Sequence, residues 1–87
     1  MKEITLFILR TCPYCIEALR LIKFLIEGDE RYRELPIALI DEYAHPEITD
    51  KFDYNYVPAF YVDGKLVHEG AADIEVIRRV FDMALGY

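Results

Sequence analysis

The stretch Arg10-Thr11-Cys12-Pro13-Tyr14-Cys15 contains both cysteines of the chain. It follows an apolar run at residues 3–9, which is typical of a buried strand. After it, residues 13–27 have apolar side chains at helical spacing, and Gly28 ends the pattern. The predicted helix would bury the positions Ile16, Leu19, Ile22 and Ile26. The two cysteines therefore lie where a strand ends and a helix begins.

The start of a helix is a favourable place for a thiolate. Backbone N–H groups there have no partner within the helix, and Pro13 suits the first helical position because its missing N–H costs nothing. Cys12 would then be the cap residue, with its sulfur facing the amides of Tyr14 and Cys15. The helix dipole supplies at most about 2 kcal/mol. A strongly lowered pKa of Cys12 would therefore also require hydrogen bonds to the thiolate, and Arg10 is a further candidate for stabilising it.

Cys15 lies one helical turn further along the chain than Cys12. It is close enough to attack a mixed disulfide on Cys12 and too deep for the first encounter, so Cys12 is predicted to attack and Cys15 to resolve. A disulfide closing so short a loop would add only about 2 kcal/mol, which argues against a structural role. The alternatives are two inert core cysteines, or half of a zinc site with only His45 and His68 as further ligands.

The next part of the chain repeats the strand and helix patterns. Residues 35–41 form a second apolar run, and a strand-helix-strand unit of this length implies that its two strands are parallel. Residues 29–34 are charged and are predicted to form the connecting loop. A short helix is predicted near residues 45–52.

The last third of the chain predicts a hairpin followed by a helix. Asp63-Gly64 is a strong hairpin signal between apolar runs at residues 57–62 and 66–69. Asp73 is a good cap for a final helix, and Gly86 ends that helix. The predicted fold class is α/β, with a four-stranded mixed sheet in the order βαβαββα and helices on both faces.

Composition limits the classes of function. A chain of 87 residues, 54% of them hydrophobic, is near the size at which one core suffices, so residues 1–87 are expected to form a single domain. The net charge of -6 argues against nucleic acid or an anionic membrane as a partner, because both need a basic surface. The first apolar run is too short for a signal peptide or a membrane span, so the cytoplasm is expected, where cysteine pairs are more often catalytic or metal-binding than structural.

The motif Cys12-Pro13-Tyr14-Cys15 resembles the active site of the dithiol glutaredoxins, a branch of the thioredoxin fold. The order of elements, Val57-Pro58 at the third strand, and Gly70 with Asp73 before the last helix also match, so the resemblance covers nearly the whole chain. It implies a thioredoxin-like fold and an enzyme that reduces protein or glutathione mixed disulfides. It also implies that Pro58 is cis and lies beside the cysteines, and that the backbone of Val57 receives an extended substrate.

The same resemblance implies a substrate site with glutathione as co-substrate, no bound cofactor and no metal. Its residues would be Arg10, Pro13, Tyr14, Lys51, Val57, Pro58, Ala72 and Asp73. Ala72 and Asp73 would receive the γ-glutamyl end of glutathione, and Arg10 or Lys51 a carboxylate. Asp73 could instead be a plain helix cap, and Lys51 a solvated charge. The expected partners are disulfide-containing proteins and a reductant, and the chain is expected to be a monomer.

Departures from the glutaredoxin pattern leave alternatives open. The usual Thr-Val-Pro and Gly-Gly are here Tyr56-Val57-Pro58 and Glu69-Gly70, so that Glu69 puts a negative charge near a site for an anionic tripeptide. A redoxin of the same fold that is reduced by a thioredoxin-reductase-type flavoprotein fits equally well. An iron-sulfur cluster carrier using Cys12 and external thiols is another alternative, against which Pro13 speaks because cluster-binding relatives generally carry a smaller residue there. The two intact cysteines argue against a binding module with a vestigial site.

Overall fold

Four strands and four helices make up the computed structural model, which describes residues 1–87. The strands are β1 (Ile4–Ile8), β2 (Ile37–Asp41), β3 (Ala59–Val62) and β4 (Lys65–Glu69). The helices are α1 (Pro13–Gly28), α2 (Glu30–Arg33), α3 (Pro46–Thr49) and α4 (Ile74–Leu85). None of the four helices combines the length and the hydrophobicity that a membrane span requires.

The sheet has the order β2-β1-β3-β4. β1 is parallel to β2 and antiparallel to β3, and β3 pairs with β4 as the Asp63-Gly64 hairpin predicts. Both hairpin residues have positive φ, which the turn requires. The predicted four-stranded mixed sheet is therefore confirmed, and its central strand β1 leads directly to the cysteine pair.

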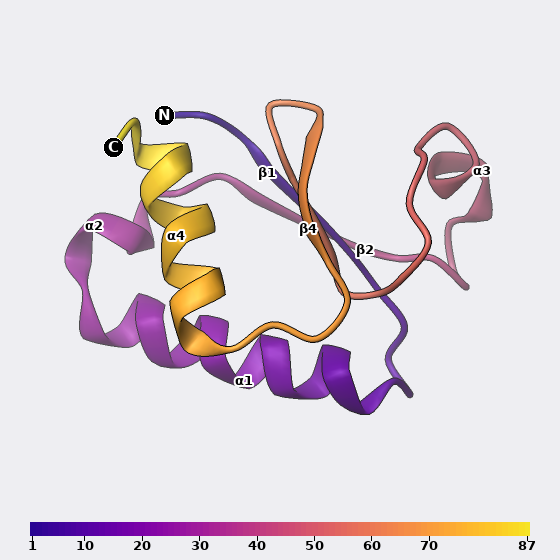
Figure 1. Cartoon of the computed structure of the whole chain (residues 1–87), viewed down its shortest axis with the longest axis horizontal. Coiled ribbons are helices and arrows are strands. Elements are labelled where there is room, and N and C mark those ends of the chain that lie inside the picture. Colours follow the sequence, from indigo (N-terminus) through magenta and orange to yellow (C-terminus); the bar gives the residue numbers. More distant parts are fainter.

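Side chains on the two faces of the sheet belong to two separate cores. The larger core lies between the sheet and the helices α1 and α4, and it includes Ile4, Leu6 and Ile8 of β1. The smaller core contains Phe7, Ala59 and Tyr61, with residues of α3 and the following segment packed against it. Figure 1 shows α3 well apart from the other three helices. The prediction of helices on both faces is confirmed.

The predicted loop over residues 29–34 is wrong, because Glu30–Arg33 form the helix α2, with Asp29 and Glu34 as its caps. Asp29 caps the helix by accepting a hydrogen bond from the amide of Arg31 at 3.0 Å. Tyr32 is buried with its ring 5.1 Å from that of Phe81, and its hydroxyl donates to Asp82 at 2.7 Å. The buried ring of Tyr32 thus anchors a short helix that the charged residues of this segment do not predict.

The buried face of α1 also differs from the predicted one. It consists of Cys15, Ala18, Ile22 and Leu25, whereas the side chain of Ile16 is 55% exposed. These positions are spaced by three, four and three residues and lie on one face of a helix. The small side chains of Cys15 and Ala18 give little hydrophobic signal, yet both are completely buried. Cys15 is therefore a core residue as well as a member of the motif.

Truncation of Phe7 tests the smaller core. Phe7 is fully buried, and its ring centroid lies 4.8 Å from that of Phe52 and 5.0 Å from that of Tyr54. We expect Phe7→Ala to lower the free energy of unfolding by about 3–5 kcal/mol, measured by urea denaturation. The control Tyr43→Ala changes a side chain that is 87% exposed and should shift stability by less than about 0.5 kcal/mol. Equal losses in the two variants would contradict this account.

Candidate active site

The cysteine pair is tied to the end of β1 through the backbone of Leu9. The carbonyl of Leu9 accepts a hydrogen bond from the amide of Cys12 at 3.1 Å, and its amide donates to Sγ of Cys15 at 3.5 Å. Cys12 has extended backbone angles and is the N-cap of α1, and Pro13 occupies the first turn. Both cysteines are free thiols. The predicted strand-to-helix junction is thus the place where the two sulfurs lie.

Cys12 is half-buried, and its environment favours the thiolate. The amide of Cys15 contributes most to lowering the pKa of Cys12, and the thiol of Cys15 and the amide of Tyr14 lower it further. The side chain of Cys12 does not form the hydrogen bond to a backbone amide that is usual for an N-cap residue. Arg10, the other candidate, forms an ion pair with Asp41 instead, at 3.2 Å.

Cys15 has the opposite environment. Its side chain is completely buried, and burial is the main reason that its pKa is raised, to about 11. The amide of Leu9 partly offsets this effect, and the negative charge of Glu42 adds to it. The thiol of Cys15 therefore stays protonated at neutral pH. The two thiols therefore differ strongly in their tendency to ionise.

In the antiparallel register of β1 and β3, Phe7 lies opposite Ala59, so the segment before β3 continues toward Leu9 and the cysteine pair. The Val57-Pro58 peptide bond is cis, as the resemblance implied. Val57 packs against the larger core, as Cys12 also does, and neither its backbone N–H nor its C=O makes a hydrogen bond. The carbonyl of Pro58 accepts from Gly70 at 2.9 Å. The backbone of Val57 is thus unpaired at the edge of the site.

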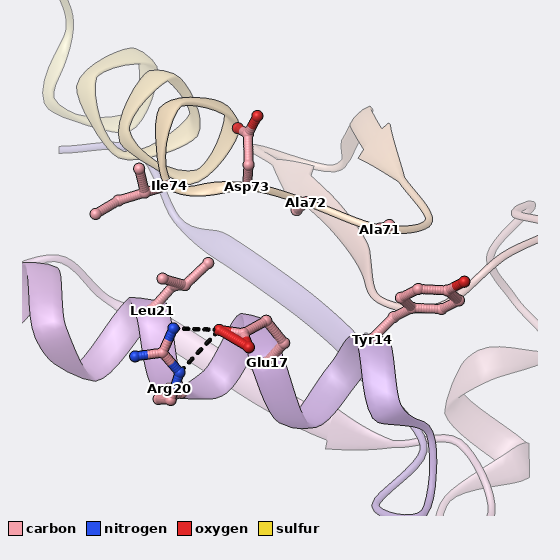
Figure 2. Close-up of a pocket in the computed structure, with 8 residues that line it drawn as sticks. All are labelled: Tyr14, Glu17, Arg20, Leu21, Ala71, Ala72, Asp73 and Ile74. Atoms are coloured by element: carbon pink, nitrogen blue, oxygen red, sulfur yellow. Dashed lines mark hydrogen bonds and ion pairs between the residues drawn. The ribbon is translucent and has the colours of Figure 1, made fainter.

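A groove begins beside the motif and runs between α1 and residues 71–74, with a volume of about 590 Å³ (Figure 2). Its lining residues are Tyr14, Glu17, Arg20, Leu21, Ala71, Ala72, Asp73 and Ile74. Tyr14, Ala72 and Asp73 are among the predicted site residues, whereas the α1 residues further along are not. Their spacing of three and seven residues from Tyr14 places Glu17 and Leu21 on one helix face, which is a signal that could have revealed them.

The polar groups around this groove are partly engaged within the protein. Asp73 accepts a hydrogen bond from the amide of Val76 at 2.9 Å, so its role as a helix cap is confirmed. Within the groove, Glu17 accepts from Nε of Arg20 at 2.8 Å. Glu69 accepts from the amides of Asn55 and Tyr56 at 2.7 and 3.0 Å, so its charge is bound to the neighbouring loop.

Two predicted site residues, Pro13 and Lys51, are exposed. Lys51 is exposed in the turn after α3 and forms no ion pair. Pro13 is exposed at the start of α1. The structure gathers no set of three or more His, Cys, Asp or Glu side chains that could hold a metal ion. The roles of Arg10, Pro13 and Lys51 toward glutathione stay predictions.

Comparison with protein families agrees with this geometry. A family model described as "Thioredoxin domain" matches residues 2–82. The chain belongs to the thioredoxin domain family. Its fold is thioredoxin-like, and Cys12 and Cys15 fit the dithiol motif of the thioredoxin-fold disulfide oxidoreductases. The narrower glutaredoxin assignment stays a prediction.

Solved structures support the thioredoxin-like fold. The oxidised thioredoxin from Plasmodium falciparum is 22% identical, with a TM-score of 0.68, and the match covers 94% of this chain and 79% of that one. A protein disulfide oxidoreductase from Aeropyrum pernix is 28% identical, with a TM-score of 0.69. That match covers 98% of this chain but only 38% of the longer Aeropyrum pernix chain. The curated proteins include no match.

The inequality of the thiols can be measured by alkylation. At slightly acidic pH we expect iodoacetamide to label Cys12 and to leave Cys15 unlabelled, because only Cys12 has a lowered pKa and some exposure. Peptide mapping by mass spectrometry locates the label, and labelling after denaturation gives the control in which both cysteines react. Equal labelling of the two cysteines in the folded protein would contradict the assignment.

The two possible roles of Asp73 can be separated by substitution. Asp73→Ala removes the cap of α4 and should cost about 1 kcal/mol of stability, measured by urea denaturation. Asp73→Ser retains a capping oxygen and should restore most of that loss, while it still removes the charge. If Asp73 also binds glutathione, both variants should weaken glutathione binding by a similar factor. Normal binding by the Ser variant would leave Asp73 as a cap only.

Proposed function

We propose that this thioredoxin-domain chain reduces disulfides in proteins or in glutathione mixed disulfides through Cys12 and Cys15. The unequal environments of the two thiols support the proposal most strongly. Cys12 is half-buried at a helix N-terminus with a lowered pKa, and Cys15 is buried with a raised pKa. This combination gives one reactive thiolate at the surface and one protected thiol within reach of it.

The reaction would proceed in two exchange steps. The Cys12 thiolate attacks one sulfur of a substrate disulfide, a Cys12–substrate disulfide forms, and the other substrate sulfur leaves as a thiolate. Cys15 then loses its proton and attacks Sγ of Cys12. The Cys12–Cys15 disulfide forms and the second substrate sulfur leaves, so that the substrate gains the two electrons that the pair loses. The raised pKa of Cys15 would make the second step faster as the pH rises.

Two surfaces beside Cys12 support binding of an extended substrate. The unpaired backbone of Val57 can add a short strand-like pairing, and the groove that begins at Tyr14 can accept side chains of a peptide. The Tyr14 side chain is 61% exposed and lies at one end of the groove (Figure 2). Both features could bind a range of cysteine-containing peptides, of which glutathione is one.

The reductant is proposed to be either glutathione or a thioredoxin-reductase-type flavoprotein. The unpaired backbone of Ala72 and the acidic group of Asp73 favour a γ-glutamyl contact. The engagement of Glu69 by two amides reduces the repulsion that its charge would exert on an anionic tripeptide. A reducing compartment such as the cytoplasm would keep both thiols ready for reaction.

Coupled assays with the two reductants test this function. We expect the wild-type protein to support NADPH oxidation on a small disulfide substrate with glutathione and its reductase or with a thioredoxin reductase. Cys12→Ser should abolish the activity in both assays, because it removes the attacking thiolate. Absence of activity with both reductants for the wild-type protein would overturn the proposed function, and activity retained by Cys12→Ser would overturn the assignment of the nucleophile.

A further inference from the structure

Glu42, an acidic residue that the reaction above does not use, lies one strand away from the connection between β1 and the cysteine pair. Glu42 follows β2, and its amide donates to the carbonyl of Ile8 at 2.9 Å. In the parallel register of β1 and β2, Ile8 is opposite Asp41, so Glu42 comes next to Leu9. Leu9 is the residue whose carbonyl binds the amide of Cys12 and whose amide binds Sγ of Cys15. One strand spacing therefore separates the backbone of Glu42 from the residue that holds both cysteines.

The side chain of Glu42 is held in place by Tyr54. The hydroxyl of Tyr54 donates to Oε2 of Glu42 at 2.8 Å. The ring of Tyr54 stacks on the buried Phe7, with centroids 5.0 Å apart and an angle of 14° between the planes. Glu42 is half-buried and has no cationic partner, whereas its neighbour Asp41 is paired with Arg10. The charge of Glu42 is therefore fixed in position and uncompensated.

We propose that Glu42, held by the hydroxyl of Tyr54, is a positioning residue that keeps a negative charge beside the dithiol and makes this protein a stronger reductant. The proposal rests on the function proposed above. In the oxidised protein the two sulfurs are neutral, whereas in the reduced protein Cys12 has thiolate character. A nearby negative charge therefore destabilises the reduced form more than the oxidised form.

The surrounding charges agree with this direction. Glu42 raises the pKa of both Cys12 and Cys15. Tyr54 stays protonated, because burial and its hydrogen bond to Glu42 raise its pKa. The other charged or titratable groups near this pair are Asp50 and Tyr61, which act on Tyr54, and the Arg10–Asp41 ion pair beside Glu42. None of these groups supplies a free cation to neutralise Glu42.

Redox equilibrium with glutathione tests the proposal directly. One oxidised glutathione and the dithiol form two reduced glutathione molecules and the Cys12–Cys15 disulfide, so the ratio of the two protein forms reports the equilibrium constant. We expect Glu42→Gln to shift this constant about tenfold toward the dithiol, which corresponds to about 30 mV. Tyr54→Phe, which frees the carboxylate, should shift it in the same direction by a smaller factor. The double variant should shift it no further than Glu42→Gln alone.

Glu34→Gln is the matched control. It removes the same charge at the exposed end of α2, beyond the far end of the 16-residue helix α1, and should leave the constant unchanged. An equal shift in this control, or no shift in Glu42→Gln and Tyr54→Phe, would overturn the proposal. Failure of the wild-type protein to form a Cys12–Cys15 disulfide would overturn the proposed function instead.

A second measurement does not depend on turnover or on the disulfide. In a Cys15→Ser background, ultraviolet absorbance of the thiolate follows the titration of Cys12 alone. Adding Glu42→Gln should lower the pKa of Cys12, and adding Glu34→Gln should not change it. A purely structural role for Glu42 would change the melting temperature without this selective change in the titration, and that result would also contradict the proposal.

Discussion

Leu9 uses both of its backbone polar groups on the cysteine pair. Its carbonyl accepts from the amide of Cys12, and its amide donates to Sγ of Cys15. These groups are available because β1 ends at Ile8, so no neighbouring strand pairs with Leu9. The start of α1 is thereby fixed against the central strand of the sheet. The position of each thiol, and with it the reactivity of each thiol, depends on this short connection.

The different reactivity of the two thiols follows from a displacement of one helical turn. Cys12 remains at the rim, near the unpaired amides of the first turn, and α1 has no acidic residue there to oppose a thiolate. Cys15 points into the larger core, where burial opposes its ionisation. The side chain of Cys15 therefore has two roles, because it packs in the larger core and is proposed to attack the mixed disulfide on Cys12. The groove, Val57 and Glu42 lie around Cys12 and Cys15, and the proposed roles of these two cysteines follow from their own environments.

Features with a local signal could be predicted from the sequence, and features that depend on the path of the chain could not. The motif, the junction and the Asp63-Gly64 hairpin involve neighbouring residues, and the structure confirms their geometry. Helix α2 was missed because Tyr32 is the only apolar residue in a charged segment. The bond between Glu42 and Tyr54 joins residues twelve positions apart across α3, and neither belongs to a motif. The carboxyl end of a strand parallel to β1 was nevertheless a place to look for such a group.

Trapping of the mixed disulfide shows which thiol attacks the substrate, and we expect Cys12 to attack and Cys15 to resolve. Cys15→Ser and Cys12→Ser proteins are each incubated with oxidised glutathione and with a disulfide peptide, and the intact masses are measured without reduction. We expect an adduct of one substrate half on the Cys15→Ser protein and none on the Cys12→Ser protein. An adduct on Cys15 in the folded Cys12→Ser protein, formed as fast as the adduct on Cys12, would contradict the assignment.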